Sequence, residues 1–121
     1  MDPVAIAHFA AKAALDKKAT RLCLQDVRGL SDLCQFQLIC SAQNEKQTRA
    51  ICQNIEESLR KVGQRPMAIE GKQSGQWILV DYGSLIVHIF ENYLRDHYCP
   101  EELWADAKFV DLSLTQLPPT A

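Results

Sequence analysis

Hydrophobic side chains recur every three or four residues in two stretches of the chain, which predicts two amphipathic helices. The first helix begins at Asp2-Pro3, since Asp can accept hydrogen bonds from free N–H groups and Pro is tolerated in the first turn. It is expected to end near Lys17-Lys18. The second helix runs over residues 44–62, with a capping-box pattern at Asn44 and Gln47 and a left-handed stop at Gly63.

Between and after these helices, alternating or continuous apolar runs predict strands. Five strands are expected, at residues 20–27, 36–40, 67–70, 77–81 and 85–90. The last two contain the unbroken runs Ile78-Leu79-Val80 and Leu85-Ile86-Val87, which favour strands covered on both faces. A short helix follows over residues 92–98, ahead of Pro100, and residues 101–104 are expected to add one turn.

The order of these elements is αββαβββα, which predicts an α/β sandwich with a mixed five-stranded sheet. With 121 residues, the chain is long enough for one domain with a hydrophobic core. That domain is expected to span residues 1–111. Residues 112–121 are expected to form a flexible C-terminal tail, because they contain two prolines and no clear period.

Composition narrows the class of protein. A formal net charge of -2 argues against binding nucleic acid mainly by phosphate neutralisation, and no sequence-specific nucleic-acid binding is expected. No apolar run approaches the ~20 residues that span a bilayer. The N-terminus also lacks a basic segment followed by an apolar one, the pattern of a secretory signal. We therefore expect a cytoplasmic protein without a membrane partner.

The cysteines do not predict a metal site. Five are present, at positions 23, 34, 40, 52 and 99, and none forms a C-x-x-C pair of the kind that binds zinc. In a reducing compartment they are expected to be small apolar fillers with free thiols. Neither a metal nor a cofactor is expected.

Asp81 and His88 are the candidates for acid–base chemistry. They lie on neighbouring strands of one predicted hairpin, so they could approach each other, and a His–carboxylate pair can move protons. No nucleophile motif stands beside them, and a purely structural hydrogen-bonded pair is the alternative. Gly71 and Gly75 flank a polar loop that leads into a strand, whereas a phosphate-binding loop leads into a helix. That loop is therefore interpreted as a turn that needs permissive backbone angles.

Large aromatic residues in the second half of the chain are candidates for partner contact. Trp77, Tyr98 and Trp104 are the aromatics most suited to an exposed face, because Trp and Tyr dominate protein interfaces. Packing in the core is the alternative for each of them. Phe residues on apolar stripes are expected in the core, namely Phe9, Phe36 and Phe90.

Basic residues gather on and after the second helix, at Lys46, Arg49, Arg60, Lys61 and Arg65. Acidic residues of the same helix dilute this charge, among them Glu45, Glu56 and Glu57. The pattern favours a solvated helix face over an RNA-binding patch.

The segment EGKQSGQWILVDYGSLIVHIF, followed by LRDHYCPEELW, closely resembles the ribosomal silencing factor family, also called the Iojap-like family. The residues that carry the resemblance are Glu70, Gly71, Trp77, Asp81, Gly83, His88, Arg95, Tyr98, Leu103 and Trp104. The hydrophobic pattern agrees from Ala5 to Trp104. The chain departs from the family pattern at Cys34-Gln35, where Thr-Asp is usual, at residues 41–44, and at Gln47, where a His is usual.

The resemblance implies a fold similar to nucleotidyltransferases but without their catalytic acids, and a protein that is not an enzyme. It implies binding to large-subunit ribosomal protein fourteen on the subunit-joining face of the large ribosomal subunit. The bound factor would sterically block the small subunit and repress translation under nutrient limitation. A role in large-subunit assembly and a homodimer are also implied.

On this hypothesis, the residues around the docking surface are Gly71, Trp77, Asp81, His88, Tyr98 and Trp104. An acidic domain also suits a basic ribosomal protein by charge complementarity. The alternative hypothesis is a nucleotide-binding or nucleotidyltransferase-like enzyme that uses Asp81 and His88. A third is a dimeric adaptor for a different protein.

Overall fold

The structure, a computed structural model, describes residues 2–98, 100–102 and 107–112. Its elements, in chain order, are α1 (Pro3–Asp16), β1 (Thr20–Asp26), β2 (Phe36–Ala42), α2 (Glu45–Arg60), β3 (Ala68–Glu70), β4 (Trp77–Asp81), β5 (Leu85–Glu91), α3 (Asn92–Tyr98), a 3-10 helix (Pro100–Glu102) and β6 (Lys108–Val110). The predicted helices and strands are confirmed within a few residues. Two further predictions, a turn reaching residue 104 and a flexible tail, fall on positions 103–104 and 113–121, outside the described residues.

Within the described residues, one mixed sheet has the strand order β3-β4-β5-β2-β1-β6. β2 and β5 are parallel, and every other neighbouring pair is antiparallel. The prediction of five strands was wrong because β6 is a sixth, paired with Leu24–Asp26 of β1. Three residues are too few to show a two-residue period, so only pairing with β1 identifies this strand.

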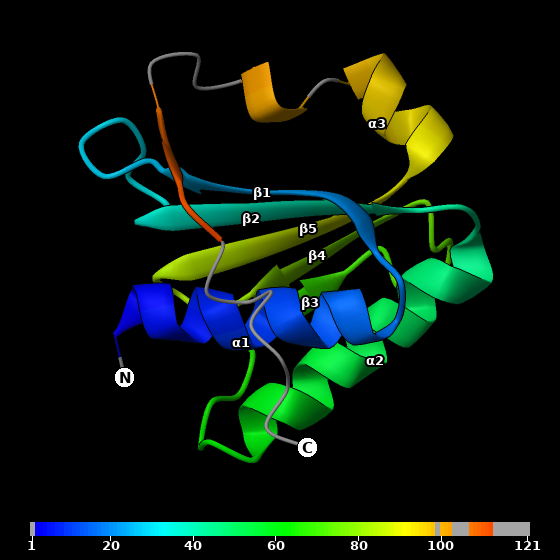
Figure 1. Cartoon of the computed structure of the whole chain (residues 1–121), viewed down its shortest axis with the longest axis horizontal. Coiled ribbons are helices and arrows are strands. Elements are labelled where there is room, and N and C mark those ends of the chain that lie inside the picture. The colour runs from blue at the N-terminus through cyan, green and yellow to red at the C-terminus, as the bar shows by residue number, and fades with distance from the viewer. Residues whose placement is uncertain (1, 99, 103–106, 113–121) are drawn as a thin grey trace.

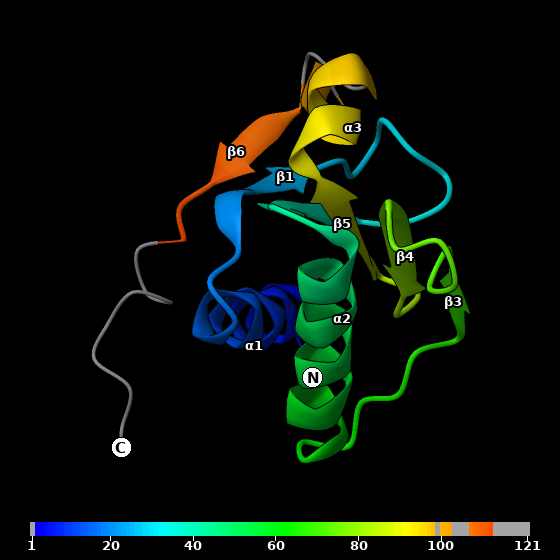
Figure 2. The same cartoon turned by 90° about the vertical axis from the view of Figure 1, so that its right-hand side faces the viewer.

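Helices α1 and α2 lie side by side against one face of the sheet, and α3 lies on the opposite face (Figures 1 and 2). Strand alternation sends one set of side chains under α1 and α2, where they form the main core. This core includes Leu24, Leu38, Val80, Val87 and Ile89 from the sheet, and Ile51, Ile55 and Leu59 from α2. We call the opposite side of the sheet the outer face.

Helix α1 packs through a face made mostly of alanines, including Ala7, Ala10 and Ala14. Small side chains allow the helix backbone to lie close to its neighbours, and Asn54 of α2 donates to the carbonyl of Ala13 at 2.8 Å. The prediction that Phe9 belongs to the core was wrong, since its side chain is 39% exposed. It stands beside the buried face rather than on it. Phe36 and Phe90 are buried as predicted.

The predicted cap of α2 is confirmed and also serves a second helix. Asn44 Oδ1 accepts from the backbone N–H of Gln47 at 2.8 Å, and Gln47 Oε1 accepts from the N–H of Gln43 at 2.9 Å. The side-chain amide of Gln47 donates to the carbonyls of Lys17 and Lys18, at 3.0 and 3.1 Å. One glutamine therefore satisfies polar groups at the start of α2 and just past the end of α1.

Arg95 fastens α3 to the outer face of the sheet. Its side chain is only 3% exposed. The guanidinium donates to the carbonyl of Arg21 and to Ser41 Oγ, the latter at 2.8 Å, and it also contacts Cys23 Sγ at 3.8 Å. Because these partners lie on β1 and β2, Arg95 fixes the helix over the middle of the sheet.

The outer face is only partly covered. On β1 and β2 it contains the buried pair Gln25 and Gln37, whose side-chain amides are hydrogen bonded at 2.9 Å. Towards β4, by contrast, Leu79 and Ile86 are half-buried. The expectation that both faces of β4 and β5 are covered was therefore wrong for these positions, because Arg95 holds α3 over β1 and β2. This leaves an accessible surface beside α3.

The buried thiols fit the interpretation of the cysteines as fillers. Cys34, Cys40 and Cys52 are buried and unbridged, and Cys23 is half-buried. Burial raises the pKa of Cys40 and of Cys52 to about 12 in each case, which keeps both thiols protonated. Cys99 lies outside the described residues.

Candidate functional site

Four rings form a cluster on the outer face, and we call Trp77, His88, Phe90 and Tyr98 the aromatic cluster. The antiparallel register of β4 and β5 places Trp77 opposite Phe90, and Leu79 opposite His88, on the same face. The ring centroids of Trp77 and Phe90 are 4.9 Å apart and stacked, and those of Trp77 and Tyr98 are 5.7 Å apart. Tyr98 comes from the end of α3, so the cluster joins sheet to helix.

The cluster offers exposed rings on a buried base. Trp77 is 38% exposed and Tyr98 57%, whereas Phe90 is inaccessible and His88 is 8% exposed. Beside Trp77, a shallow depression of about 240 Å³ is lined by Glu70, Gly71, Trp77 and Leu79. The prediction of exposed faces on Trp77 and Tyr98 is confirmed, whereas Trp104 lies outside the described residues.

His88 holds the Trp77 ring through a hydrogen bond. The indole Nε1–H donates to His88 Nδ1 at 3.1 Å, so that nitrogen carries no proton. Burial lowers the pKa of His88 to about 4, which keeps the imidazole neutral at physiological pH. A neutral acceptor of fixed position therefore fixes the orientation of the Trp77 ring.

This pair makes stability depend on pH in a defined window. The pKa of His88 is about 4 when folded and about 6.5 when unfolded, so its contribution is complete above pH 6.5 and is lost as the pH falls towards 4. When the pH falls from 7 to 5, we expect the protonation of His88 to lower the free energy of unfolding by roughly 2 kcal/mol. Urea unfolding at both pH values should show this loss in the wild type and not in His88→Gln, which keeps an acceptor for Trp77. A His88 that titrates near pH 6.5 by NMR would contradict the expectation.

Asp81 does not join His88. It is opposite Ile86 in the register, at the far end of β4, and its Oδ1 accepts from the backbone N–H of Gly83 at 2.7 Å. Among the described residues, no hydrogen bond connects the two side chains. Asp81 thus shapes the turn between β4 and β5, and the acid–base pair considered from the sequence is not assembled.

Gly71 contributes backbone shape. Its φ is +82°, in the left-handed region, and a Cβ at this position would lie 2.0 Å from the carbonyl oxygen of Trp77. The Gly71 carbonyl also accepts from the N–H of Gly75 at 2.9 Å, which closes the loop. Gly71 therefore lets the start of the loop pass directly against the backbone of Trp77.

Gly71→Ala should lower the free energy of unfolding by about 2 kcal/mol, since a left-handed alanine costs about 1 kcal/mol and the contact with Trp77 adds a comparable term. Gly63→Ala is the matched control. Its φ is +82° as well, but no atom lies within 4 Å of the added Cβ. The difference in unfolding free energy between the two variants, measured with urea, gives the cost of the contact between the added Cβ and the Trp77 carbonyl. Equal losses of stability would show that this contact costs nothing.

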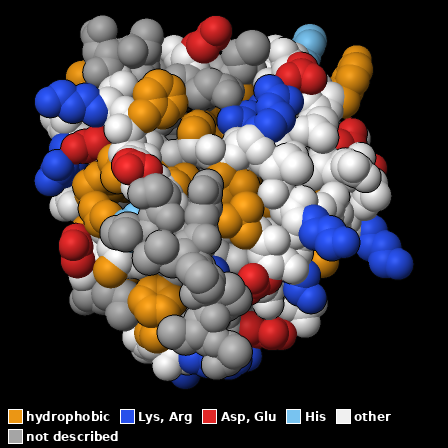
Figure 3. Space-filling model, viewed as in Figure 1, with side chains coloured by type: hydrophobic (Ala, Val, Ile, Leu, Met, Phe, Trp, Pro, Cys, Tyr) orange, Lys and Arg blue, Asp and Glu red, His pale blue; other side chains and the backbone are white. Residues whose placement is uncertain are grey.

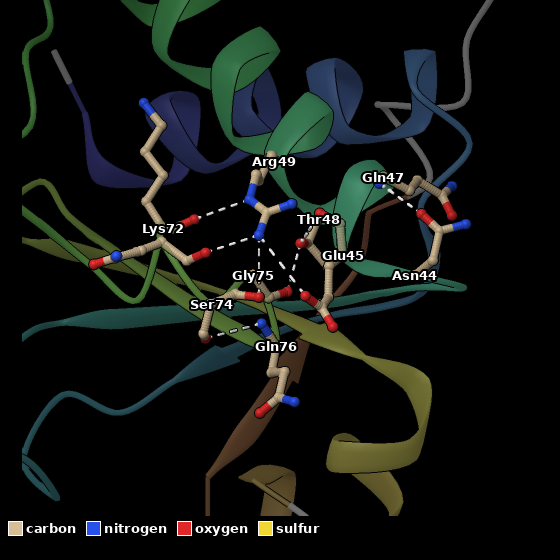
Figure 4. Close-up of polar contacts among 10 residues, drawn as sticks. Asn44, Glu45, Gln47, Thr48, Arg49, Lys72, Ser74, Gly75 and Gln76 are labelled. Atoms are coloured by element: carbon tan, nitrogen blue, oxygen red, sulfur yellow. Dashed lines mark hydrogen bonds and ion pairs between the residues drawn. The ribbon is translucent and has the colours of Figure 1, made fainter.

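The loop at residues 71–75 is fixed by two side chains of α2: Arg49, which was predicted to lie on a solvated helix face, and Thr48, for which nothing was predicted from the sequence. Arg49 and Thr48 donate hydrogen bonds to four successive carbonyls of the loop, those of residues 72–75 (Figure 4). Adjacent residues of a helix point about 100° apart, so this spacing alone does not place both side chains against the loop. Only the tertiary contact shows that both face the loop.

An acidic residue lies beside the cluster. Glu70 lines the depression beside Trp77, and Glu91 follows Phe90 on β5. Figure 3 shows another side of the molecule, on which α1 and β6 lie, and there the described Lys and Arg side chains are dispersed among Asp and Glu.

No group of three or more His, Cys, Asp or Glu side chains in the described residues is placed to hold a metal ion. None of the helices in the described part of the chain combines the length and the apolar character that crossing a membrane requires.

The sequence is similar to a family of proteins over most of its length. Residues 2–120 match the family model described as ribosomal silencing factor during starvation. Ribosomal silencing factor RsfS of Bacillus subtilis is 35% identical over 112 residues, covering 93% of this chain and 95% of the relative. The chloroplastic protein Iojap of Zea mays is 31% identical over 105 residues, covering 84% of this chain and 44% of that protein.

A solved structure shares the fold. The crystal structure of a protein from Chromobacterium violaceum superimposes with a TM-score of 0.84 at 30% sequence identity. The match covers 89% of this chain and 90% of that one.

Proposed function

The chain belongs to the family of ribosomal silencing factors, and we propose that it binds the large ribosomal subunit through large-subunit ribosomal protein fourteen. In this position it blocks the joining of the small subunit by its bulk, and so represses translation when nutrients are limiting. The predicted cytoplasmic location suits this role and stays a prediction.

The observation that carries the proposal is the aromatic cluster. Trp77 and Tyr98 present exposed rings at fixed positions, and rigid aromatics of this kind provide contact area at low entropic cost. Glu70 lies at its margin, where it lines the depression beside Trp77 and offers an acidic contact to a basic ribosomal protein. Gly71, Asp81 and His88 support this surface through backbone shape, a turn and an acceptor, respectively.

A steric block requires that the protein binds tightly and at the right place on the subunit, and it requires no catalytic turnover. The enzyme alternative used Asp81 and His88 together, and their separate hydrogen bonds give it no geometric support. The homodimer and the resemblance to nucleotidyltransferases remain predictions. Light scattering at micromolar concentration would test the dimer.

The direct test is sedimentation with purified ribosomal subunits. We expect the protein to sediment with large subunits at low salt and not with small subunits. When it is incubated with large subunits first, fewer joined ribosomes should form on addition of small subunits, as read from a sucrose gradient. Absence from the large-subunit fraction at low salt would overturn the proposal. Retention without any effect on joining would overturn the steric block alone.

A further inference from the structure

We propose that Arg49 is a positioning residue for the docking surface, because it fixes the loop at residues 72–75 from which Trp77 emerges. This inference rests on the proposed function and adds to it a residue remote from the aromatic rings. Arg49 lies on α2, whereas the cluster lies on the outer face of the sheet and on α3. It acts on the partner through the loop.

One guanidinium binds three consecutive carbonyls. Arg49 Nε donates to Lys72 O at 3.1 Å, and Nη2 donates to Gln73 O at 2.8 Å and to Ser74 O at 3.2 Å (Figure 4). Glu45 Oε1 stands 3.7 Å from the same Nη2, one helical turn earlier. The planar fork of an arginine suits such a set of acceptors, whereas the single ammonium of a lysine does not reproduce its spacing.

A second side chain of α2 binds the fourth carbonyl of the loop, that of Gly75. Thr48 Oγ1 donates to Gly75 O at 2.5 Å, in a buried position. A Cβ on Gly75 would lie 2.9 Å from Glu45 Cβ and 3.2 Å from Arg49 Cζ. The backbone of the loop is therefore in direct contact with the first turns of α2, although the side chains of Lys72, Gln73 and Ser74 are exposed.

Backbone contacts at both ends of the loop also fix the position of Trp77. Gln76, the next residue, accepts through its carbonyl from the N–H of Glu91 at 2.9 Å. Gly71 passes against the carbonyl of Trp77 at the other end. With Arg49 and Thr48 holding the middle, the chain that leads into Trp77 is fixed before any partner arrives.

This arrangement reduces the cost of binding. An exposed polar loop that is free to move would have to be ordered on docking, and such ordering is subtracted from affinity. Fixing the loop in advance removes that cost. Loss of Arg49 should therefore appear in the mobility of the loop and in affinity for the partner more than in the stability of the fold.

The test uses the full chain with Arg49→Ala, Arg49→Lys and the matched control Lys46→Ala. Lys46 is exposed and lies on the same helix, and its replacement by alanine removes the same charge as Arg49→Ala. In Arg49→Ala we expect amide hydrogen exchange at Gly75 and Gln76, whose N–H groups donate hydrogen bonds within the loop, to rise roughly tenfold, with exchange in β2 and β5 unchanged. Affinity for purified large subunits should fall roughly tenfold. Arg49→Lys should behave like Arg49→Ala, and Lys46→Ala like the wild type.

Thr48 supplies an independent pair of variants. Thr48→Val removes the hydroxyl at nearly constant volume, and Thr48→Ser keeps it. We expect the valine variant to loosen the loop and weaken binding, and the serine variant to restore both. The indole Nε1–H resonance of Trp77 should shift in Thr48→Val and Arg49→Ala and not in Thr48→Ser.

Three outcomes would overturn the inference: unchanged loop exchange in Arg49→Ala, unchanged affinity despite a loosened loop, or rescue by Arg49→Lys, which would show that charge alone matters. Failure of the wild type to bind large subunits would instead overturn the proposed function. The exchange pattern and the Trp77 resonance would then still decide whether Arg49 positions the loop.

Discussion

Replacing Trp77 with alanine should weaken binding to large ribosomal subunits by roughly a hundredfold, the effect of losing a central aromatic anchor. The ring is more than a third exposed, is stacked on Phe90, and is oriented by His88. Its removal takes away contact area and opens the side of the cluster to water. The measurement is a binding isotherm with purified large subunits at fixed salt.

Two further variants distinguish the specific contribution of Trp77 from that of any exposed aromatic ring. Trp77→Phe keeps the stacking on Phe90 but has no donor for His88, so binding should fall only severalfold. Phe109→Ala removes an aromatic ring that is 66% exposed on β6, at the opposite edge of the sheet, and should leave binding nearly unchanged. Equal losses from Trp77→Ala and Phe109→Ala would contradict the location of the docking surface.

Arg95→Met should produce the largest loss of stability, about 3 kcal/mol, which corresponds to a melting temperature lower by roughly 10 °C. The change preserves much of the side-chain volume but removes the donors to Arg21 O and Ser41 Oγ. Ser41 is inaccessible to solvent, so water cannot replace the lost donor without opening the structure. Urea and thermal unfolding measure the effect.

The control for Arg95 is Arg60→Met, at an exposed position in the last turn of α2, where we expect a change within about 0.5 kcal/mol. Because Arg95 fixes α3, its loss should also displace Tyr98 from Trp77 and weaken binding. A variant that is destabilised but binds with wild-type affinity at low temperature would show that α3 is not needed for docking.

Local signals were sufficient for most of the fold. The cap at Asn44 and the stop after α2 depend on a few neighbouring residues, so the sequence places that helix well. β6 was missed because a three-residue strand exists only through its pairing with β1. Phe9 was misplaced because buried alanines, rather than a large apolar side chain, define the packed face of α1.

The candidate site was predictable in part. Once the turn at Gly83 is placed, the antiparallel register brings Trp77 opposite Phe90 and two residues from the position facing His88, so the cluster could have been read from strand alternation. Pairing Asp81 with His88 ignored that register. The contacts of Arg49 and Thr48 span more than twenty residues between a helix and a loop, and no local pattern encodes them.

The short strands at both edges of the sheet have a consequence for behaviour at high concentration. Within the described residues, β3 and β6 are each three residues long, and they carry the charged side chains of Glu70 and Lys108. A long, flat edge strand offers unpaired backbone groups on which further copies can stack into fibrils. These edges offer few such groups, so the chain can accumulate with its aromatic rings exposed while edge-to-edge aggregation stays unfavourable.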